Sequence, residues 1–189
     1  MQIDTALLKN MIGDITHPPP PPLDRGYQSA CVFLLLFNKS DPHILAIQKS
    51  DTEGYPWRNQ VALPGGHIDK QDAGSLDAAY RELEEEVGIK KSAVEFLGSI
   101  GHFQTILKKD IEAFTGIWNE TGTLFFDSEE ISRILRLPLR ELVEIHKKSD
   151  FSGRIPDVGE LIYPIQDVTV WGLTARIFHY LIELLYPTY

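Results

Sequence analysis

The chain has 189 residues, 43% of them hydrophobic and 24% charged, which predicts one globular domain with modest additions. Its 27 acidic and 18 basic residues give a formal net charge of −9, which argues against nonspecific binding to nucleic acid or to an anionic membrane. An anionic substrate would therefore need a local cation, most simply a divalent metal ion. Cys31 is the only cysteine, and there is no basic-then-apolar leader or apolar run near 20 residues, so we expect a soluble cytoplasmic protein without disulfides.

The first 26 residues predict a short helix followed by a spacer. The helix is indicated by apolar residues with the spacing of one helical face: Ile3, Leu7, Leu8, Met11 and Ile12. Gly13 is suited to end it, and the uninterrupted proline run Pro18–Pro22 predicts an extended polyproline II segment. We therefore expect residues 1–26 to form a helix that packs on the domain and a proline-rich spacer, and residues 27–189 to form the main domain.

The main domain begins with strands. "YQSACVFLLLF" (27–37) and "HILAIQK" (43–49), joined by a polar turn, predict a buried hairpin, in which Cys31 is a core residue. Further strands are expected at "AVEFLGSI" (93–100), "EAFTGIWN" (112–119) and "GTLFF" (122–126). A polar helix start is expected at Ser128. A strand end that leads into a helix is predicted at "LRLPLRELVEI" (135–145). An amphipathic helix is predicted at "WGLTARIFHYLIELL" (171–185).

A short helix rich in glutamate lies between the predicted strands. Ser75 is a suitable N-cap and Gly88 suits the left-handed position that ends a helix, so residues 76–87 are predicted to be helical. The face that packs on a sheet is predicted from four apolar residues with helical spacing: Leu76, Ala79, Leu83 and Val87. Glu82, Glu85 and Glu86 are related as i, i+3 and i+4, so their carboxylates share another face.

Carboxylates at this spacing repel one another, so a compensating positive charge is expected. Mg²⁺ and Mn²⁺ take carboxylate and carbonyl oxygens as ligands, and Arg81 could orient one carboxylate through a charge-assisted hydrogen bond. The alternative is an ordinary solvated acidic face, which is how we interpret Glu84. Ahead of the helix, Gly65 and Gly66 allow the backbone to approach a ligand or metal closely.

The diglycine turn and "RELEEEVGI" together resemble the Nudix box, in which Gly, five residues, Glu and seven residues precede Arg-Glu, an aliphatic residue, any residue, Glu-Glu, any residue and Gly. Here Gly66 is followed by five residues, Asp72, eight residues and Arg81, so Asp replaces the first Glu and the loop is one residue longer. The resemblance implies an α/β Nudix fold, an α/β/α sandwich around a mixed β-sheet. It also implies roles for box residues: Glu82, Glu85, Glu86 and the Gly65 carbonyl at the metal, Arg81 as a salt-bridge partner, and Gly66 and Gly88 as structural positions.

Three further stretches are similar to the coenzyme A pyrophosphatase-like branch of this family: "YPWRNQVALPGG", "EEISRILRLPLREL" and "VWGLTARIFHYLIELL". The second makes Glu130 the candidate distal acid, with Glu129 as a neighbouring choice. The branch has Arg-Ser where this chain has Lys49 and Ser50, and the spacing to Pro64 is one residue longer. Candidate substrate contacts are Lys49, Trp57, Arg58 and His67, and each also has an ordinary explanation as a solvated or packing residue.

The resemblance implies a pyrophosphohydrolase that uses Mg²⁺ or Mn²⁺ and cleaves the diphosphate of a nucleoside diphosphate derivative. Coenzyme A or an acyl derivative is the first expectation, with 3',5'-ADP and 4'-phosphopantetheine as the products of coenzyme A. Glu82, Glu85 or Glu130 would serve as general base. The alternatives are the same chemistry on ADP-ribose, NADH or another dinucleotide, and a noncatalytic Nudix-like binding module. Enzymes of this type often work as dimers, so a homodimer is one expectation.

Overall fold

The computed structural model describes residues 4–15, 26–53 and 57–185. The predicted proline spacer, Pro18–Pro22, lies outside these residues. In chain order the elements are α1 (Thr5–Gly13), β1 (Gln28–Phe37), β2 (His43–Lys49), β3 (Val61–Ala62), β4 (Gly65–His67), α2 (Ser75–Val87), the 3-10 turn η2 (Lys91–Ala93), β5 (Val94–Gln104), β6 (Lys109–Trp118), β7 (Ile131–Pro138), α3 (Leu139–Lys148), β8 (Ile162–Ile165), β9 (Val168–Trp171) and α4 (Gly172–Leu185).

A mixed sheet forms the middle layer. Within the described residues, seven strands make up this sheet in the order β3-β2-β1-β6-β5, with β4 paired to β1 and β7 paired to β2. The β1–β6 pair is parallel and the other pairs are antiparallel. Strands β1 and β2 pair only near their shared turn, so β3 and β4 occupy the space where the two strands separate. This arrangement places the diglycine of β4 inside the sheet.

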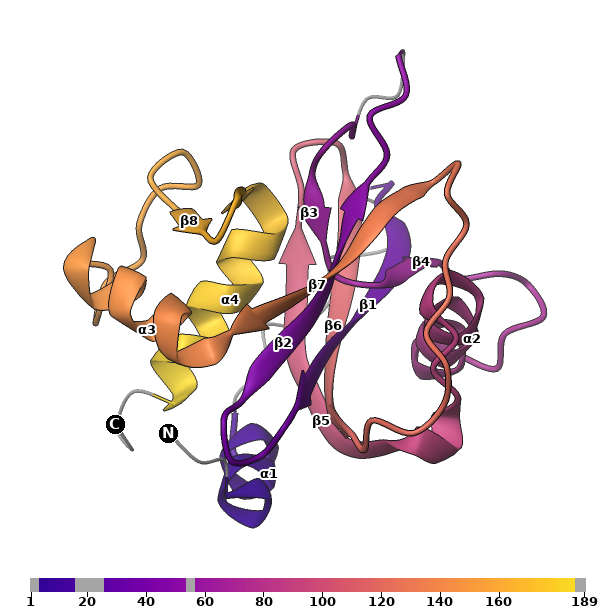
Figure 1. Cartoon of the computed structure of the whole chain (residues 1–189), viewed down its shortest axis with the longest axis horizontal. Helices are drawn as coiled ribbons and strands as arrows, with labels where there is room; N and C mark the ends of the chain where they lie inside the picture. The colour runs from indigo at the N-terminus through magenta and orange to yellow at the C-terminus, as the bar shows by residue number, and fades with distance from the viewer. Residues whose placement is uncertain (1–3, 16–25, 54–56, 186–189) are drawn as a thin grey trace.

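Helices cover both faces of the sheet (Figure 1). On one face α2 buries Ala79, Leu83 and Val87 against a core that includes Phe33 and Leu35 of β1. The other face forms a second core with α1, α3 and α4, because the strand residues between those of the first core point the opposite way. The predicted α/β/α sandwich around a mixed sheet is thus confirmed.

Several local predictions are wrong. Gly74, not Ser75, is the N-cap of α2, and the Ser75 hydroxyl donates to the Glu112 carboxylate. "GTLFF" (122–126) is not a strand, because no neighbouring strand pairs with it; Phe125 instead donates its N–H to the carbonyl of Val87 at the end of α2. The polar segment at Ser128 forms a turn rather than a helix start, and it leads into β7, which pairs with β2.

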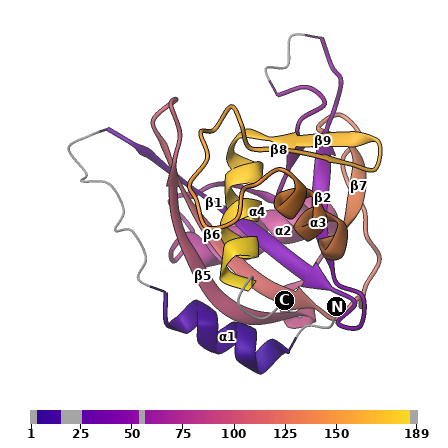
Figure 2. The same ribbon diagram turned by 90° about the vertical axis from the view of Figure 1, so that its left-hand side faces the viewer.

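A two-stranded hairpin, β8–β9, was not predicted from the sequence. It packs beside α3 and α4, away from the main sheet's α2 face (Figure 2). Its strands are four residues each and one contains Pro164, which is why their pattern is weak. Among the described residues, no helix is long and apolar enough to cross a bilayer.

The N-terminal helix packs on the domain, and it lies along β5 (Figure 2). Asp4 caps it by accepting the N–H of Leu7 at 3.0 Å. Leu8 and Ile12 are fully buried in the same core as α4. Gly98 of β5 lies directly beneath Ile12, where a β-carbon would overlap the Ile12 side chain. The helix is therefore joined to the core by close packing.

Ile12→Ala should lower the free energy of unfolding by about 2–4 kcal/mol, because it leaves a cavity between α1 and β5. Urea denaturation monitored by circular dichroism measures this change. The exposed Lys9→Ala in the same helix should stay within about 0.5 kcal/mol of the unsubstituted chain. Equal stability of the two variants would show that α1 is not part of the core.

A buried histidine cluster joins α3, β8 and α4. The Nδ1 of His146 lies 2.9 Å from the Tyr163 hydroxyl, and its Nε2 lies 2.8 Å from Glu183 Oε1. A neutral imidazole satisfies both contacts, with Nε2–H donating to the carboxylate and Nδ1 accepting from the phenol. The His179 ring lies 5.0 Å from that of His146, and burial lowers the pKa of His179.

The pKa of His179 predicts a loss of stability in acid. Its pKa in the folded chain is below the ordinary value of 6.5, so the unfolded chain binds more protons as the pH falls through about 6.5. The free energy of unfolding should therefore be smaller at pH 5.5 than at pH 7.5, and His179→Gln should reduce this difference. Urea denaturation at both pH values tests this, with the exposed His67→Gln as control. An unchanged pH dependence in His179→Gln would contradict the prediction.

Candidate active site

The acidic helix α2 is anchored along one side and ended by a glycine. Leu83 and Val87 are fully buried against the sheet, which leaves the glutamate face directed away from the core. Gly88 ends the helix in the left-handed conformation, φ 76°, and its N–H donates to the Glu84 carbonyl at 3.0 Å. The site carboxylates therefore project from a rigid element, while Glu84 is exposed as expected for a surface residue.

Arg81 connects the glutamates to the loop before the helix. Its Nη1 donates to Glu82 Oε1 at 2.9 Å and to Glu85 Oε2 at 3.0 Å. Its Nε and Nη2 each donate to an oxygen of Asp72 at 3.1 Å, and Nη2 also donates to the His67 carbonyl at 3.1 Å. Because the guanidinium is planar and has five N–H donors, one side chain holds three carboxylates and a backbone oxygen in fixed positions.

Asp72 has a place in this network that sequence reasoning did not assign. Its side chain is only 4% exposed, and the hydrogen bonds from Arg81 hold the pKa of the Asp72 carboxyl below its ordinary range. Asp is one methylene shorter than the Glu of the box, and the loop is one residue longer. The loop before Arg81 is therefore longer where the acidic side chain is shorter, and both Asp72 oxygens still accept hydrogen bonds from Arg81. The sequence signal for this contact is Asp72 itself, which is separated from Gly66 by five residues, as the first Glu of the box is.

Gly66 permits a close approach by Glu82. A β-carbon on Gly66 would overlap the Glu82 carboxylate, so a larger residue there would displace the Glu82 side chain from this position. Burial raises the pKa of Glu82, and the hydrogen bond and charge of Arg81 oppose that effect. Beneath Gly66, burial raises the pKa of Cys31 to about 11, so this thiol stays protonated and is a core residue rather than a nucleophile.

Glu86 is held by a different cation. Its Oε1 lies 2.8 Å from Lys49 Nζ at the end of β2, and its Oε2 accepts the N–H of Gly65 at 2.9 Å. Gly65 has φ 152°, and a β-carbon there would overlap the Cys31 carbonyl oxygen. The backbone contact at Gly65 thus requires glycine, whereas Gly66 leaves room for the end of the Glu82 side chain.

Glu82, Glu85 and Glu86 supply the hard oxygen donors that Mg²⁺ and Mn²⁺ prefer, so this donor set fits such an ion. In the part of the chain that the structure describes, no three His, Cys, Asp or Glu side chains already surround one metal position. The carboxylates instead face Arg81 and Lys49. The need for positive charge at this helix face is therefore met by two side chains of the protein.

The remaining candidates lie around this network. The Glu130 carbonyl accepts the N–H of Ser50 at 2.9 Å, and the Glu129 carbonyl accepts the Ser50 hydroxyl at 2.7 Å, so this turn lies beside Lys49. His67 is exposed, with Nε2 3.2 Å from Lys109 Nζ. Trp57 and Arg58 follow the loop after β2, and within the described residues Arg58 pairs with Asp51 rather than with α2. The structure thus brings Glu130 and His67 near the network and leaves Arg58 outside it.

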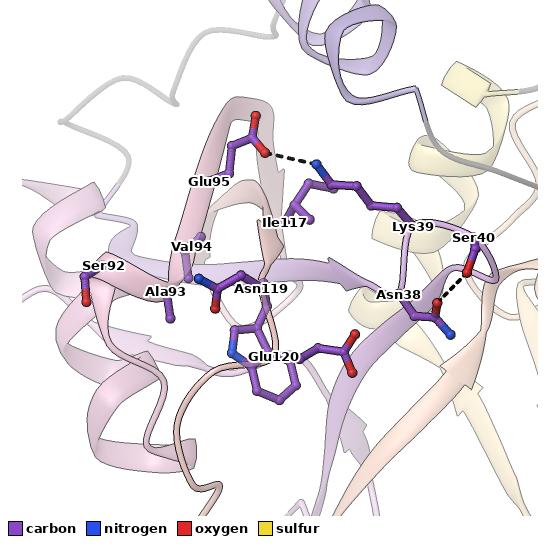
Figure 3. Close-up of a pocket in the computed structure, with 11 residues that line it drawn as sticks. Asn38, Lys39, Ser40, Ser92, Ala93, Val94, Glu95, Ile117, Asn119 and Glu120 are labelled. Carbon is purple, nitrogen blue, oxygen red and sulfur yellow. Dashed lines mark hydrogen bonds and ion pairs between the residues drawn. The ribbon is translucent and has the colours of Figure 1, made fainter.

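A cavity of about 720 Å³ lies at the opposite end of β1 from β4 (Figure 3). It is lined by the β1–β2 turn, the start of β5 and the end of β6, and Lys39 and Glu95 form an ion pair of 3.3 Å across it. None of the candidate site residues lines it. The candidate active site is instead the surface formed by α2, β4 and the end of β2.

Comparison with known proteins agrees with this geometry. The model of the NUDIX domain matches residues 27–156. The chain is 30% identical over 168 residues to the uncharacterized Nudix hydrolase NudL of Photorhabdus laumondii, covering 88% of this chain and 89% of that one. It is 27% identical over 171 residues to that of Yersinia enterocolitica, covering 89% and 87% of the two chains.

Two solved structures support the fold. One is a binary complex of the Caenorhabditis elegans Ap4A hydrolase, with a TM-score of 0.52 and 18% identity over 65% of this chain and 89% of that one. The other is the NUDIX domain of Shewanella oneidensis NrtR complexed with ADP ribose, with a TM-score of 0.51 and 16% identity over 71% and 85% of the two chains. The family match and the relationship to NudL, together with the box geometry on α2, show that the chain belongs to the Nudix domain family and is a Nudix hydrolase.

Proposed function

We propose that the chain is a Mg²⁺- or Mn²⁺-dependent pyrophosphohydrolase that cleaves the diphosphate of a nucleoside diphosphate derivative. One observation carries this proposal: Glu82, Glu85 and Glu86 share a helix face on which Arg81 and Lys49 offset their charge. Nudix hydrolases in general use divalent metal ions, and these carboxylates would hold one. When bound, the ion supplies positive charge that neutralises the diphosphate and makes water more acidic.

Glu82 is the best candidate for the group that accepts a proton from the attacking water. Burial raises the pKa of its carboxyl, and Arg81 Nη1 orients the carboxylate through a hydrogen bond of 2.9 Å. The Glu85 side chain is 61% exposed and is oriented by Arg81, so its role is to complete the metal ligand set. Glu130 remains the alternative base, because its turn lies beside Lys49 and approaches the same surface from β7.

Coenzyme A, or an acyl derivative of it, is the substrate that we propose. Its support is the similarity of three segments to the coenzyme A pyrophosphatase-like branch. One of these segments forms β7 of the main sheet and the start of α3, and another forms α4. Trp57 keeps 37% of its surface exposed, which suits stacking on an adenine ring. ADP-ribose, NADH and other dinucleotides are the alternatives, because all of them contain the diphosphate that a metal ion held by these carboxylates would neutralise.

We assign the hydrolase domain to residues 27–189 and a cytoplasmic location to the enzyme.

The substrate is tested by mass spectrometry of products after incubation with Mg²⁺ or Mn²⁺ and a panel of coenzyme A, ADP-ribose, NADH, dinucleoside polyphosphates and nucleoside triphosphates. We expect cleavage of coenzyme A to 3',5'-ADP and 4'-phosphopantetheine. Glu82→Gln should lower kcat by roughly 100-fold or more, as expected for the loss of a general base, whereas the exposed Glu84→Gln should keep full activity. Cleavage of another compound but not of coenzyme A would identify that compound as the substrate in place of coenzyme A. No turnover of any compound would favour a noncatalytic binding module.

Asp72→Asn tests the Arg81 network. The substitution removes the negative charge of the Asp72 carboxylate, which accepts hydrogen bonds from Arg81 at both of its oxygens. The Arg81 guanidinium is then less well held against Glu82 and Glu85. We expect kcat to fall by about 10–100-fold, the usual effect of losing a residue that orients metal ligands. Asp69, whose side chain is 57% exposed and lies 3.7 Å from Arg81, provides the control Asp69→Asn, for which we expect little change. Equal effects in the two variants would mean that Asp72 has no special role.

A further inference from the structure

The turn that joins β5 to β6 carries two apolar side chains in solvent. Ile106 is 100% exposed and Leu107 is 58% exposed. Both lie at the centre of a four-residue turn, in which the Lys108 N–H donates to the Thr105 carbonyl at 3.0 Å. The residues usual in such turns are proline, glycine, aspartate, asparagine and serine. The needs of the turn therefore do not explain two aliphatic residues at these positions.

Hydrogen bonds on both strands fix the base of this turn. The Thr105 hydroxyl accepts the N–H of Lys109 at 3.1 Å, and the Thr105 N–H donates to the Lys109 carbonyl at 2.9 Å. The next residue, Asp110, accepts a hydrogen bond of 2.6 Å from Gln104 Nε2 and lies 2.8 Å from His102 Nδ1. The two apolar side chains are thus presented outward from a well-ordered turn.

Positive charge lies directly beside the apolar side chains. We call residues 106–109 the hairpin tip. Lys108 is exposed, and Lys109 Nζ lies 3.2 Å from His67 Nε2. The acidic residue that follows, Asp110, is only 5% exposed. Because the Debye length is about 8 Å at physiological ionic strength, charges much farther away contribute little to the field here. The tip is therefore locally basic, although the whole chain has a formal net charge of −9.

The shape of the tip favours a lipid bilayer as its partner. The hairpin ends beside the start of β1, where Gln28 pairs with Lys109 (Figure 2). A small ligand or a single acyl chain is normally enclosed by a concave site, and the fully exposed Ile106 has no wall around it. A bilayer, by contrast, accepts apolar side chains to a depth of about 5–10 Å and places anionic headgroups beside adjacent lysines.

We propose that the hairpin tip docks the protein onto an anionic lipid bilayer. Ile106 and Leu107 enter the boundary between headgroups and acyl chains, while Lys108 and Lys109 contact lipid phosphates and carboxylates. The acidic remainder of the chain opposes approach in other orientations, so docking occurs through this end of the sheet. Docking is independent of the proposed function, because residues 106–109 include none of the candidate site residues.

Co-sedimentation of the full chain with vesicles of phosphatidylcholine and phosphatidylserine measures the partition coefficient. Ile106→Ser combined with Leu107→Ser should lower it by about tenfold or more, because the side chains that enter the bilayer are lost. Lys108→Gln should lower it by about fivefold on these vesicles, the effect of one lysine near an anionic surface. On vesicles of phosphatidylcholine alone, Lys108→Gln should have no effect.

Ile155 provides a matched control, because it is 96% exposed in the segment between α3 and β8. Ile155→Ser should bind vesicles as the unsubstituted chain does. A second readout is Ile106→Cys labelled with a polarity-sensitive fluorophore, which reacts selectively because the natural cysteine, Cys31, is buried. Its emission should shift to shorter wavelength when vesicles are added, whereas labelled Ile155→Cys should show no shift.

Failure of the unsubstituted chain to bind anionic vesicles would overturn the proposal. Equal partition coefficients for the Ile106→Ser, Leu107→Ser double variant and for Ile155→Ser would also overturn it. A rise in KM in the double variant, without vesicle binding by the unsubstituted chain, would assign the tip to the substrate instead of to a bilayer.

Discussion

Repulsion among three carboxylates on one helix face is the constraint around which this site is built. Glu82, Glu85 and Glu86 would each be stable alone on a solvated helix, but together they require positive charge close by. Arg81 meets that need from within the helix, and Lys49 meets it from the sheet. The two cations thus offset the charge of these carboxylates and hold them in fixed positions.

The topology of the sheet makes these contacts possible. Because β1 and β2 separate beyond their turn, β4 enters the sheet and brings Gly65 and Gly66 against the glutamates. The buried side of α2 prevents the helix from moving away from β4. The end of β2 carries Lys49 to Glu86, and its bonds to the turn before β7 bring Glu130 to the same surface. Three segments, β4, the end of β2 and the turn before β7, thus come together beside α2.

Local patterns predicted the long elements well. The helix at residues 75–87, the first two strands and the C-terminal helix have clear periodicity or continuous apolar runs, and the resemblance to the Nudix box supplied the residues on α2. Contacts between distant segments could not be predicted in the same way. The Lys49–Glu86 pair depends on how β2 lies against α2, and "GTLFF" has strand-forming residues but no strand beside it. The contact of Asp72 with Arg81 could not be predicted either, because Asp72 is shorter than the Glu of the box and the loop that carries it is one residue longer.

The central claim is that the face of α2 stabilised by Arg81 and Lys49 is a divalent metal site. Anomalous diffraction from crystals of the protein soaked in Mn²⁺ tests it most directly. The account predicts an anomalous peak within about 2.3 Å of carboxylate oxygens of Glu82, Glu85 or Glu86. A Mn²⁺ peak elsewhere, with the Lys49–Glu86 ion pair intact in the same crystal, would contradict it.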